Sequence, residues 1–182
     1  DTGYGSPVNV FRTVSLFEKA GVAGIHIEDQ NWPKRCGHLA GKTLIPANEM
    51  AAKINAACDA RNDKDFLIIA RTDALALDGL NAALDRAKLY EEAGADVIFV
   101  ESPRTTEEIR AIPKKLSKPA LFNMASSGKT PFLSREEIAS HGYKLAIYPN
   151  FAMLAAIPSV RNYLAELHEK GTVSHIVNDM AS

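Results

Sequence analysis

The sequence has little of several features that mark specialised classes of protein. It contains only two cysteines, Cys36 and Cys58, which are too few for a disulfide framework and predict a reducing, cytoplasmic environment. No apolar run is long enough to cross a bilayer, and the first residues lack the pattern of a signal peptide. The formal net charge of -1 favours neither nucleic acid nor a membrane surface as a partner. These absences leave an ordinary globular protein with one domain core.

Residues 24–38 hold the densest group of side chains that can carry chemistry. The stretch begins as a short apolar run, typical of a buried strand, and breaks at residues 31–33 into a polar loop. His26 and Glu28 are two positions apart, so on a strand their side chains share one face. A carboxylate and an imidazole at the end of a strand suit metal binding or acid/base chemistry.

Cys36 lies in that loop among Lys34, Arg35 and His38. Positive charge around a thiol favours the thiolate, the form that acts as nucleophile or base. Gly37 allows the backbone to come close to a ligand. The alternative, that Cys36 is a small core residue beside solvated charges, is less favoured because buried structural cysteines rarely lie in a polar loop. The loop is therefore a candidate reactive segment.

Helical segments alternate with short apolar strands along the chain. Strict alternation predicts a parallel sheet, either closed as a β/α barrel or open and doubly wound. The predicted strands cover residues 23–28, 65–71, 95–101, 120–124 and 144–148, and the predicted helices cover 7–20, 46–61, 80–93 and 150–170, with two more that begin after Thr105 and Ser134.

Polar residues close four successive strands: Glu28, Arg71, Glu101 and Asn123. Barrel enzymes assemble their sites from several strands at this edge, whereas an open sheet concentrates its chemistry at one switch point. Any one of the four could be a solvated rim residue, but four in succession favour a site and a closed barrel.

Lys34-Arg35-Cys36-Gly37-His38 resembles the Lys-Lys/Arg-Cys-Gly-His signature of the isocitrate lyase and phosphoenolpyruvate mutase superfamily, in its methylisocitrate lyase and 2,3-dimethylmalate lyase branch. The similarity continues in order through the chain. Residues 1–5 resemble the end of the metal motif, residues 24–30 the Gly-Ile-His-Ile-Glu-Asp-Gln strand, and residues 70–74 the Ala-Arg-Thr-Asp-Ala segment, followed by Glu101, Phe122-Asn123-Met124 and Gly128-Lys129-Thr130-Pro131.

The resemblance implies a (β/α)8 TIM-type barrel, of which this chain carries only the later part. Residues 1–182 are then a single catalytic domain, incomplete at both ends, because family members have strands before Asp1 and further helix after Ser182. An aspartate two places before Asp1 that contacts the metal is missing. The resemblance also implies a homo-oligomer, usually a tetramer.

The resemblance further implies a magnesium enzyme, with Mn²⁺ as a substitute. Asp1 and Glu28 hold the ion, largely through water, as suits Mg²⁺. Arg71 provides a planar, bidentate grip on a substrate carboxylate. Small carboxylates are therefore the expected ligands.

Cys36 is expected to protonate the carbanion that forms when the carbon–carbon bond breaks. By resemblance, His38, Gly37 and Asn123 bind the enediolate product. Glu101 organises the site together with the arginine, and both contact substrate. Cys36, His38, Arg71 and Glu101 form the expected catalytic set.

The expected activity is a lyase that cleaves a 2-hydroxy di- or tricarboxylate, such as 2-methylisocitrate or 2,3-dimethylmalate, into a 2-oxo acid and a second carboxylic acid. Residues 123–131 are closer to the dimethylmalate branch. An oxaloacetate hydrolase remains an alternative, although its members have a serine where Pro149 aligns. A carboxyphosphonoenolpyruvate or phosphonate mutase is another, although those relatives generally lack the Cys-Gly-His loop. A non-catalytic fragment or scaffold is the alternative of a different class.

Overall fold

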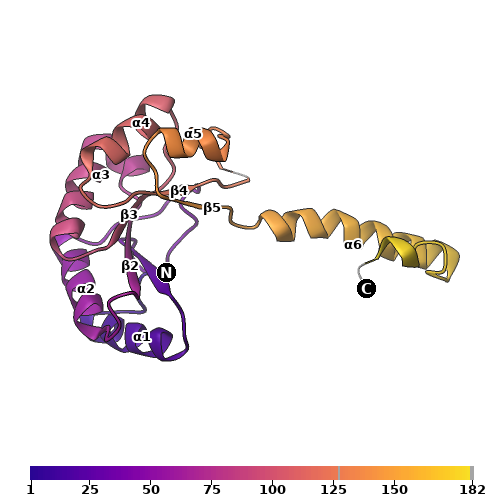
Figure 1. Ribbon diagram of the computed structural model, residues 1–182, viewed down its shortest axis with the longest axis horizontal. Coiled ribbons are helices and arrows are strands. Elements are labelled where there is room, and N and C mark those ends of the chain that lie inside the picture. Colours follow the sequence, from indigo (N-terminus) through magenta and orange to yellow (C-terminus); the bar gives the residue numbers. More distant parts are fainter. Residues whose placement is uncertain (127, 181–182) are drawn as a thin grey trace.

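The computed structural model describes residues 1–126 and 128–180, and its helices and strands alternate as predicted (Figure 1). The strands are β1 (Gly24–Glu28), β2 (Leu67–Thr72), β3 (Val97–Val100), β4 (Leu121–Asn123) and β5 (Leu145–Ile147). The helices are α1 (Pro7–Lys19), α2 (Ala47–Ala60), α3 (Leu75–Glu92), α4 (Thr106–Lys115), α5 (Arg135–Ser140) and α6 (Phe151–Lys170), with a 3₁₀ turn η1 at Val177–Asp179.

The strands run parallel in the order of the sequence. β1, β2 and β3 form one sheet and β4 pairs with β5. A parallel bridge between Ile98 and Ala120 joins the two groups, and the Ile98 N–H donates to the Pro119 carbonyl at 2.9 Å. Parallel neighbours connected by helices are the repeating unit of a β/α barrel, so the predicted fold class is confirmed for the part that this chain covers.

The register gives the sheet two different faces. Paired residues of parallel strands share a face, so Ile27, Ala70 and Ile98 lie on the face that packs against the helices. That face belongs to a large buried apolar cluster with Val10, Val14, Met50 and Ile54 of α1 and α2. The opposite face, which would line the barrel interior, carries a smaller apolar cluster around Val97, Phe99 and Leu121. The polar residues follow this interior face to the carboxyl ends of the strands.

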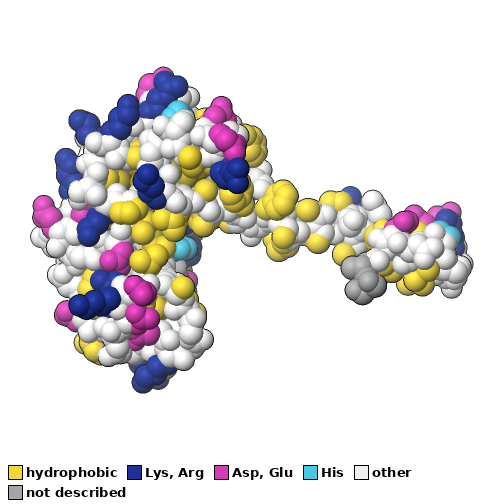
Figure 2. Space-filling view, in the orientation of Figure 1, with side chains coloured by type: hydrophobic (Ala, Val, Ile, Leu, Met, Phe, Trp, Pro, Cys, Tyr) yellow, Lys and Arg dark blue, Asp and Glu magenta, His cyan; other side chains and the backbone are white. Residues whose placement is uncertain are grey.

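Helix α6 is set apart from this packed body. Figure 1 shows α1 to α4 in an arc around the strands, while α6 extends away from them after β5. No residue of α6 is buried. Its exposed apolar residues give the yellow stretch of Figure 2: Phe151, Met153, Leu154, Ile157, Val160, Leu164 and Leu167.

Helix α3 departs from the sequence prediction at its start. It begins at Leu75 instead of residue 80, and non-helical backbone at Gly79 (φ 85°, ψ 178°) interrupts it. Glycine reaches this φ without the steric penalty of a side chain, so two helical pieces join there. Capping boxes are present at Thr105 and Ser134, where each side chain accepts the amide three residues later. None of the described helices combines the length and apolar character needed to cross a membrane.

Candidate active site

Arg71, at the end of β2, lies at the centre of a group of buried carboxylates. Its Nε and Nη2 donate to the two Asp73 oxygens at 2.9 and 3.0 Å, the bidentate geometry of a strong ion pair. Its Nη1 lies 3.4 Å from Glu101 Oε2, and its Nε lies 3.6 Å from Glu28 Oε2. Burial opposes the charge of Arg71, but the hydrogen bond to Asp73 and the charge of Glu101 outweigh burial and raise the pKa. The guanidinium is therefore a permanent cation at this edge.

Glu28 is fully buried at the end of β1, and neither of its carboxylate oxygens has a hydrogen-bond partner among the described residues. Lys34 Nζ lies 3.0 Å from Oε1 as an ion pair, outside hydrogen-bond geometry. The Asp1 carbonyl accepts the Glu28 amide at 3.0 Å, so the two predicted metal ligands are neighbours. Within residues 1–126 and 128–180, no three acidic, histidine or cysteine side chains converge as a metal cluster. Two neighbouring acidic residues, one with unsatisfied buried oxygens, fit an ion that keeps several waters.

His26 points into the barrel interior below Glu28. Its ring packs edge-on against Phe99, with centroids 6.0 Å apart. Burial lowers the pKa of His26 to about 4, and the positive charge of Arg71 acts in the same direction. His26 is therefore neutral near pH 7 and forms part of the interior wall.

The loop that carries Cys36 is closed at its base by backbone pairing. Gln30 and Leu44 form an antiparallel bridge, and the Asn31 N–H donates to the Thr43 carbonyl at 2.8 Å. The buried Gln30 side chain then donates to the Arg35 carbonyl and accepts the Arg35 N–H, both at 2.9 Å. This two-point contact fixes the backbone directly before Cys36.

Gly37 brings the loop onto the carboxylate group. A Cβ at this position would lie 2.4 Å from Glu101 Cγ, 2.5 Å from Arg71 Nη2 and 2.8 Å from Asp73 Oδ1. These distances are too short for non-bonded atoms, so only glycine allows the approach. Lys42, buried in the same loop, donates through Nζ to the Gly37 carbonyl and lies 3.9 Å from Asp73 Oδ1.

Cys36 is exposed next to Gly37, as expected of a reactive thiol. The cations that the sequence places around it have other partners: Lys34 pairs with Glu28, and Arg35 donates to the Ala40 carbonyl at 3.4 Å. The loop therefore presents the thiol at the edge of the site without a direct side-chain partner among the described residues.

His38 and Asn123 both meet Glu101. His38 Nε2 lies 3.2 Å from Glu101 Oε1, and Asn123 Nδ2 donates to both Glu101 oxygens at 3.3 Å. The Asn123 Oδ1 atom is buried and has no hydrogen-bond partner in the described part of the chain. The structure thus brings the predicted residues of β1 to β4 and of the loop together at one edge.

Sequence reasoning missed several residues that hold this edge in place. Besides Lys42 and Asp73, it missed Asp29, which is fully buried on the helix-facing side of the sheet. Asp29 accepts from Thr72 Oγ1 at 2.8 Å, from the Asp73 amide at 3.0 Å and from Tyr90 OH at 2.8 Å. Burial raises the pKa of Asp29, while these hydrogen bonds oppose the rise. The only signal in the sequence is a second acidic residue directly after Glu28.

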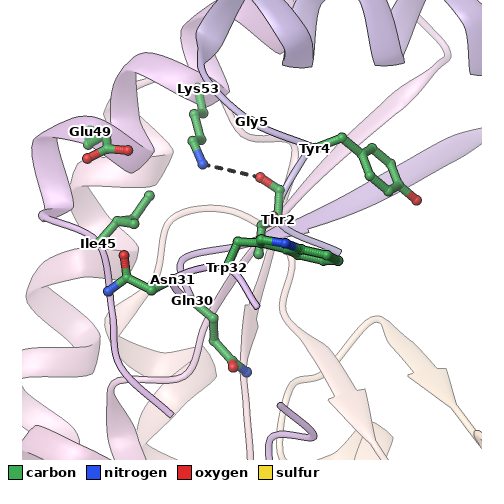
Figure 3. A pocket seen from close by; sticks show the side chains of 9 residues that line it. All are labelled: Thr2, Tyr4, Gly5, Gln30, Asn31, Trp32, Ile45, Glu49 and Lys53. Carbon is green, nitrogen blue, oxygen red and sulfur yellow. Dashed lines mark hydrogen bonds between the residues drawn. The ribbon is translucent and has the colours of Figure 1, made fainter. Parts of the chain in front are cut away.

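A cavity of about 390 Å³ lies beside the base of the loop, apart from the carboxylate group. Figure 3 shows Trp32 and Tyr4 with Lys53, whose Nζ donates to the Thr2 carbonyl at 3.3 Å. Gln30 also lines this cavity, so the residue that holds the loop backbone before Cys36 contacts the cavity as well.

Comparison with known proteins identifies the family of this chain. The model of the phosphoenolpyruvate phosphomutase family matches residues 1–168. The chain is 42% identical over 182 residues to the 2,3-dimethylmalate lyase of Eubacterium barkeri, covering 100% of this chain and 63% of that protein. The chain belongs to the phosphoenolpyruvate mutase/isocitrate lyase superfamily. It is also 45% identical over 180 residues to the 2-methylisocitrate lyase of Aeropyrum pernix, covering 99% of this chain and 58% of that protein.

Solved structures of the superfamily have the same fold. A 2,3-dimethylmalate lyase matches with a TM-score of 0.93 at 38% identity, covering 100% of this chain and 61% of that one. An oxaloacetate acetylhydrolase matches with a TM-score of 0.90 at 37% identity, covering 96% and 60%. A phosphonopyruvate hydrolase in complex with oxalate and Mg²⁺ matches with a TM-score of 0.86 at 34% identity, covering 100% and 63%. The chain thus spans about three fifths of the length of its superfamily relatives. Ser127, within the 123–131 segment that resembles the dimethylmalate branch, lies outside the described residues.

Proposed function

We propose that this protein is a Mg²⁺-dependent carbon–carbon lyase that cleaves a 2-hydroxy di- or tricarboxylate into a 2-oxo acid and a second carboxylic acid. The observation that carries the proposal is the close approach of Gly37 to Glu101 and Arg71, which brings the loop that carries Cys36 onto the buried carboxylate group. Residues 1–182 then belong to one catalytic β/α-barrel domain, of which they form an incomplete part. The names of the two lyase relatives support this reaction class.

Arg71 and Asn123 are the proposed carboxylate-binding residues. The guanidinium is a buried cation whose Nη1 makes a long contact of 3.4 Å with Glu101, so it has capacity for a further acceptor. Gly37 and His38 approach from the loop and complete the pocket. Glu101 orders these groups, since Arg71, Asn123 and His38 all lie within 3.4 Å of its carboxylate.

Asp1 and Glu28 are the proposed holders of Mg²⁺, or of Mn²⁺ in its place. The orphaned Glu28 oxygens support this assignment, as does the Mg²⁺ in the complex of the phosphonopyruvate hydrolase with oxalate. A bound divalent cation would stabilise the negative charge that develops on the substrate oxygens during bond cleavage.

Cys36 is the proposed proton donor. The 2-hydroxyl group loses its proton to solvent, and its oxygen becomes the carbonyl of the 2-oxo acid as the carbon–carbon bond breaks. The electron pair of that bond stays on the departing acid as an enediolate, and the thiol proton passes to its carbon. The thiolate that remains is the base in the reverse condensation. Because Cys36 is exposed at the edge, the reaction depends on the loop to exclude water over the substrate.

An oxaloacetate hydrolase is the second candidate, and the structural match to an oxaloacetate acetylhydrolase favours it over other members. Pro149, where those hydrolases have a serine, argues for the lyase. A phosphonate mutase is supported by the family model and by the similarity to two mutases, whereas the Cys36 loop argues against it.

The test is turnover of 2-methylisocitrate, isocitrate, 2,3-dimethylmalate and oxaloacetate by the full-length protein, with Mg²⁺ and with EDTA. Metal-dependent release of a 2-oxo acid from one hydroxy acid is the expected result. Glu28→Gln should lower the affinity for the activating Mg²⁺ by roughly 10- to 100-fold. The exposed Glu49→Gln variant is the control and should keep the wild-type affinity. Release of oxalate from oxaloacetate would instead identify the protein as the hydrolase. If none of the four acids is turned over, both the lyase and the hydrolase are excluded.

We also propose a cytoplasmic homo-oligomer, tetrameric by family resemblance, in which α6 packs against another copy. Met153, Ile157, Val160 and Leu164 recur at helical spacing along one exposed stripe. Two free cysteines suit a reducing compartment.

Sedimentation of the wild-type chain and of the double variant Ile157→Glu and Leu164→Glu tests the oligomer: the wild type should sediment as a multimer and the variant as smaller species. Equal sedimentation of the two would exclude α6 as the contact.

A further inference from the structure

Ser102 is a buried hydroxyl that the proposed reaction does not use. It lies two residues after the end of β3, is 3% exposed, and lies between Glu101 and His38 of the site. Its Oγ lies 2.8 Å from Glu101 Oε1 and 2.9 Å from His38 Nδ1. Its backbone has φ 58°, a left-handed conformation that costs energy for residues other than glycine. A strained residue whose side chain bridges two functional groups is a candidate for a role in positioning.

The hydrogens in this bridge can be counted. A serine hydroxyl has one hydrogen to donate and an ionised carboxylate has none. Glu101 also accepts from Asn123 Nδ2 and lies beside the Arg71 guanidinium, so its carboxylate oxygens face donors. The Ser102 hydrogen therefore goes to Glu101 Oε1 at 2.8 Å. The oxygen of Ser102 can then only accept at the contact with His38, so the hydrogen there belongs to Nδ1.

We infer that Ser102 is a positioning residue that holds His38 with its proton on Nδ1 and so leaves Nε2 as the nitrogen that meets the ligand. This inference rests on the proposed function for its consequence in turnover, but the protonation pattern stands on the geometry alone. His38 Nε2 is buried and has no hydrogen-bond partner in the described ranges, because its 3.2 Å contact with Glu101 lacks hydrogen-bond geometry. It therefore accepts from a ligand hydroxyl, or donates once the ring gains a second proton.

Gly128 provides the space that this orientation of the ring needs. A Cβ there would lie 2.5 Å from His38 Cε1 and 2.8 Å from Nε2. Ser102 thus contacts the ring on its Nδ1 side, and the absence of a side chain at Gly128 leaves room for the opposite edge of the ring. Without the hydroxyl, the nearby Glu101 carboxylate favours a proton on Nε2 instead, because a carboxylate attracts a donor.

The experiment measures the tautomer of His38 by ¹⁵N NMR in the full chain labelled at its histidines, at alkaline pH where the rings are neutral. A His38→Gln variant assigns the signals among the five histidines. The wild type should show a protonated-type signal at Nδ1 and a lone-pair-type signal at Nε2. Ser102→Ala and Ser102→Gly should both move the proton to Nε2. Both should lower kcat/KM by roughly 2- to 12-fold, the value of one hydrogen bond.

The two substitutions separate the hydroxyl from the backbone. Glycine relieves the strain at φ 58° and alanine keeps it, while both remove the hydroxyl. Retention of the Nδ1 proton in either folded variant would overturn the inference. Wild-type turnover in Ser102→Gly alone would also overturn it, since the effect would then come from backbone strain. If the wild type turns over none of the tested acids, the proposed function fails while the tautomer measurement still decides the role of Ser102.

Discussion

The carboxyl edge of β1 to β3 and helix α6 expose the wrong kind of side chain to opposite degrees: the edge buries charged groups, whereas α6 leaves apolar groups in contact with water. At the edge, Glu28, Arg71 and Glu101 are almost fully buried, and their charges compensate one another. In α6, which has an exposed apolar stripe instead, no residue is buried at all. A buried charge requires partners from its own chain to be tolerated, whereas an apolar helix can obtain its partner from another molecule. The difference indicates that the charges of the edge have oppositely charged partners within the described chain, whereas the apolar stripe of α6 has no such cover there.

The largest expected effect tests the chemistry of the edge. Cys36→Ser should lower kcat by roughly 10²- to 10⁴-fold, because the hydroxyl is a far weaker acid than the thiol that it replaces. Binding of oxalate, measured by calorimetry, should change little, since Cys36 is exposed and makes no side-chain contact within the group. If Cys36→Ser turns over substrate at the wild-type rate, Cys36 is not the proton donor.

A matched pair of isoleucines sharpens the comparison in terms of stability. Ile68 in β2 is fully buried, whereas Ile157 in α6 is 51% exposed. Ile68→Ala should lower the free energy of unfolding by about 2–5 kcal/mol, through lost burial and the cavity left behind. Ile157→Ala should change it by about 0.5 kcal/mol or less in dilute solution. Denaturant titration at two protein concentrations checks both values. An Ile157→Ala effect that grows with concentration would reflect the proposed contact between copies.

A smaller effect is expected from the loop. Lys42→Met removes the ammonium that joins the Gly37 carbonyl to the region of Asp73 and leaves that carbonyl without its buried partner. We expect the loop to open more often and trypsin to cleave faster after Lys34 and Arg35, by roughly fivefold to tenfold, the value of one lost hydrogen bond. The exposed Lys64→Met variant is the control. Equal cleavage of the two variants would show that Lys42 does not hold the loop.

The smallest effect concerns the two thiols. Burial raises the pKa of Cys58, and its Sγ lies 3.3 Å from the Gly94 carbonyl. Its thiolate therefore forms only at higher pH than that of an ordinary thiol, so alkylation of Cys58 should rise late in an alkaline titration. Cys36 is exposed and should react first at every pH. Mass spectrometry after brief treatment with iodoacetamide distinguishes the sites, and faster modification of Cys58 would contradict the packing.

Much of the fold could be predicted from local pattern. Apolar runs and helical spacing placed all five strands, and the polar residues at four strand ends indicated the edge before any contact was known. The early start of α3 was missed, because Gly79 reads as a helix breaker and in fact joins two helical pieces. Local rules succeed where a segment's own sequence decides its conformation.

The supporting residues of the site could not be predicted in this way. Lys42 reads as a surface lysine of a polar loop, and Ser102 as an ordinary loop serine, because their roles come from contacts that the local pattern does not encode. Asp29 looks like a second acidic residue after Glu28, yet it points to the opposite face and ties β1 to β2 and α3. In α6 the helix was predicted, but an apolar stripe does not reveal what it packs against. Such roles depend on tertiary packing.

The contact at Gly37 also offers a criterion for sorting genomic sequences. Because a single methyl group there would overlap the side chains of Glu101 and Arg71, any relative with a larger residue at this position must hold its loop differently. Glycine here, together with the arginine and glutamate, is therefore a physical criterion for a loop held as it is in this chain.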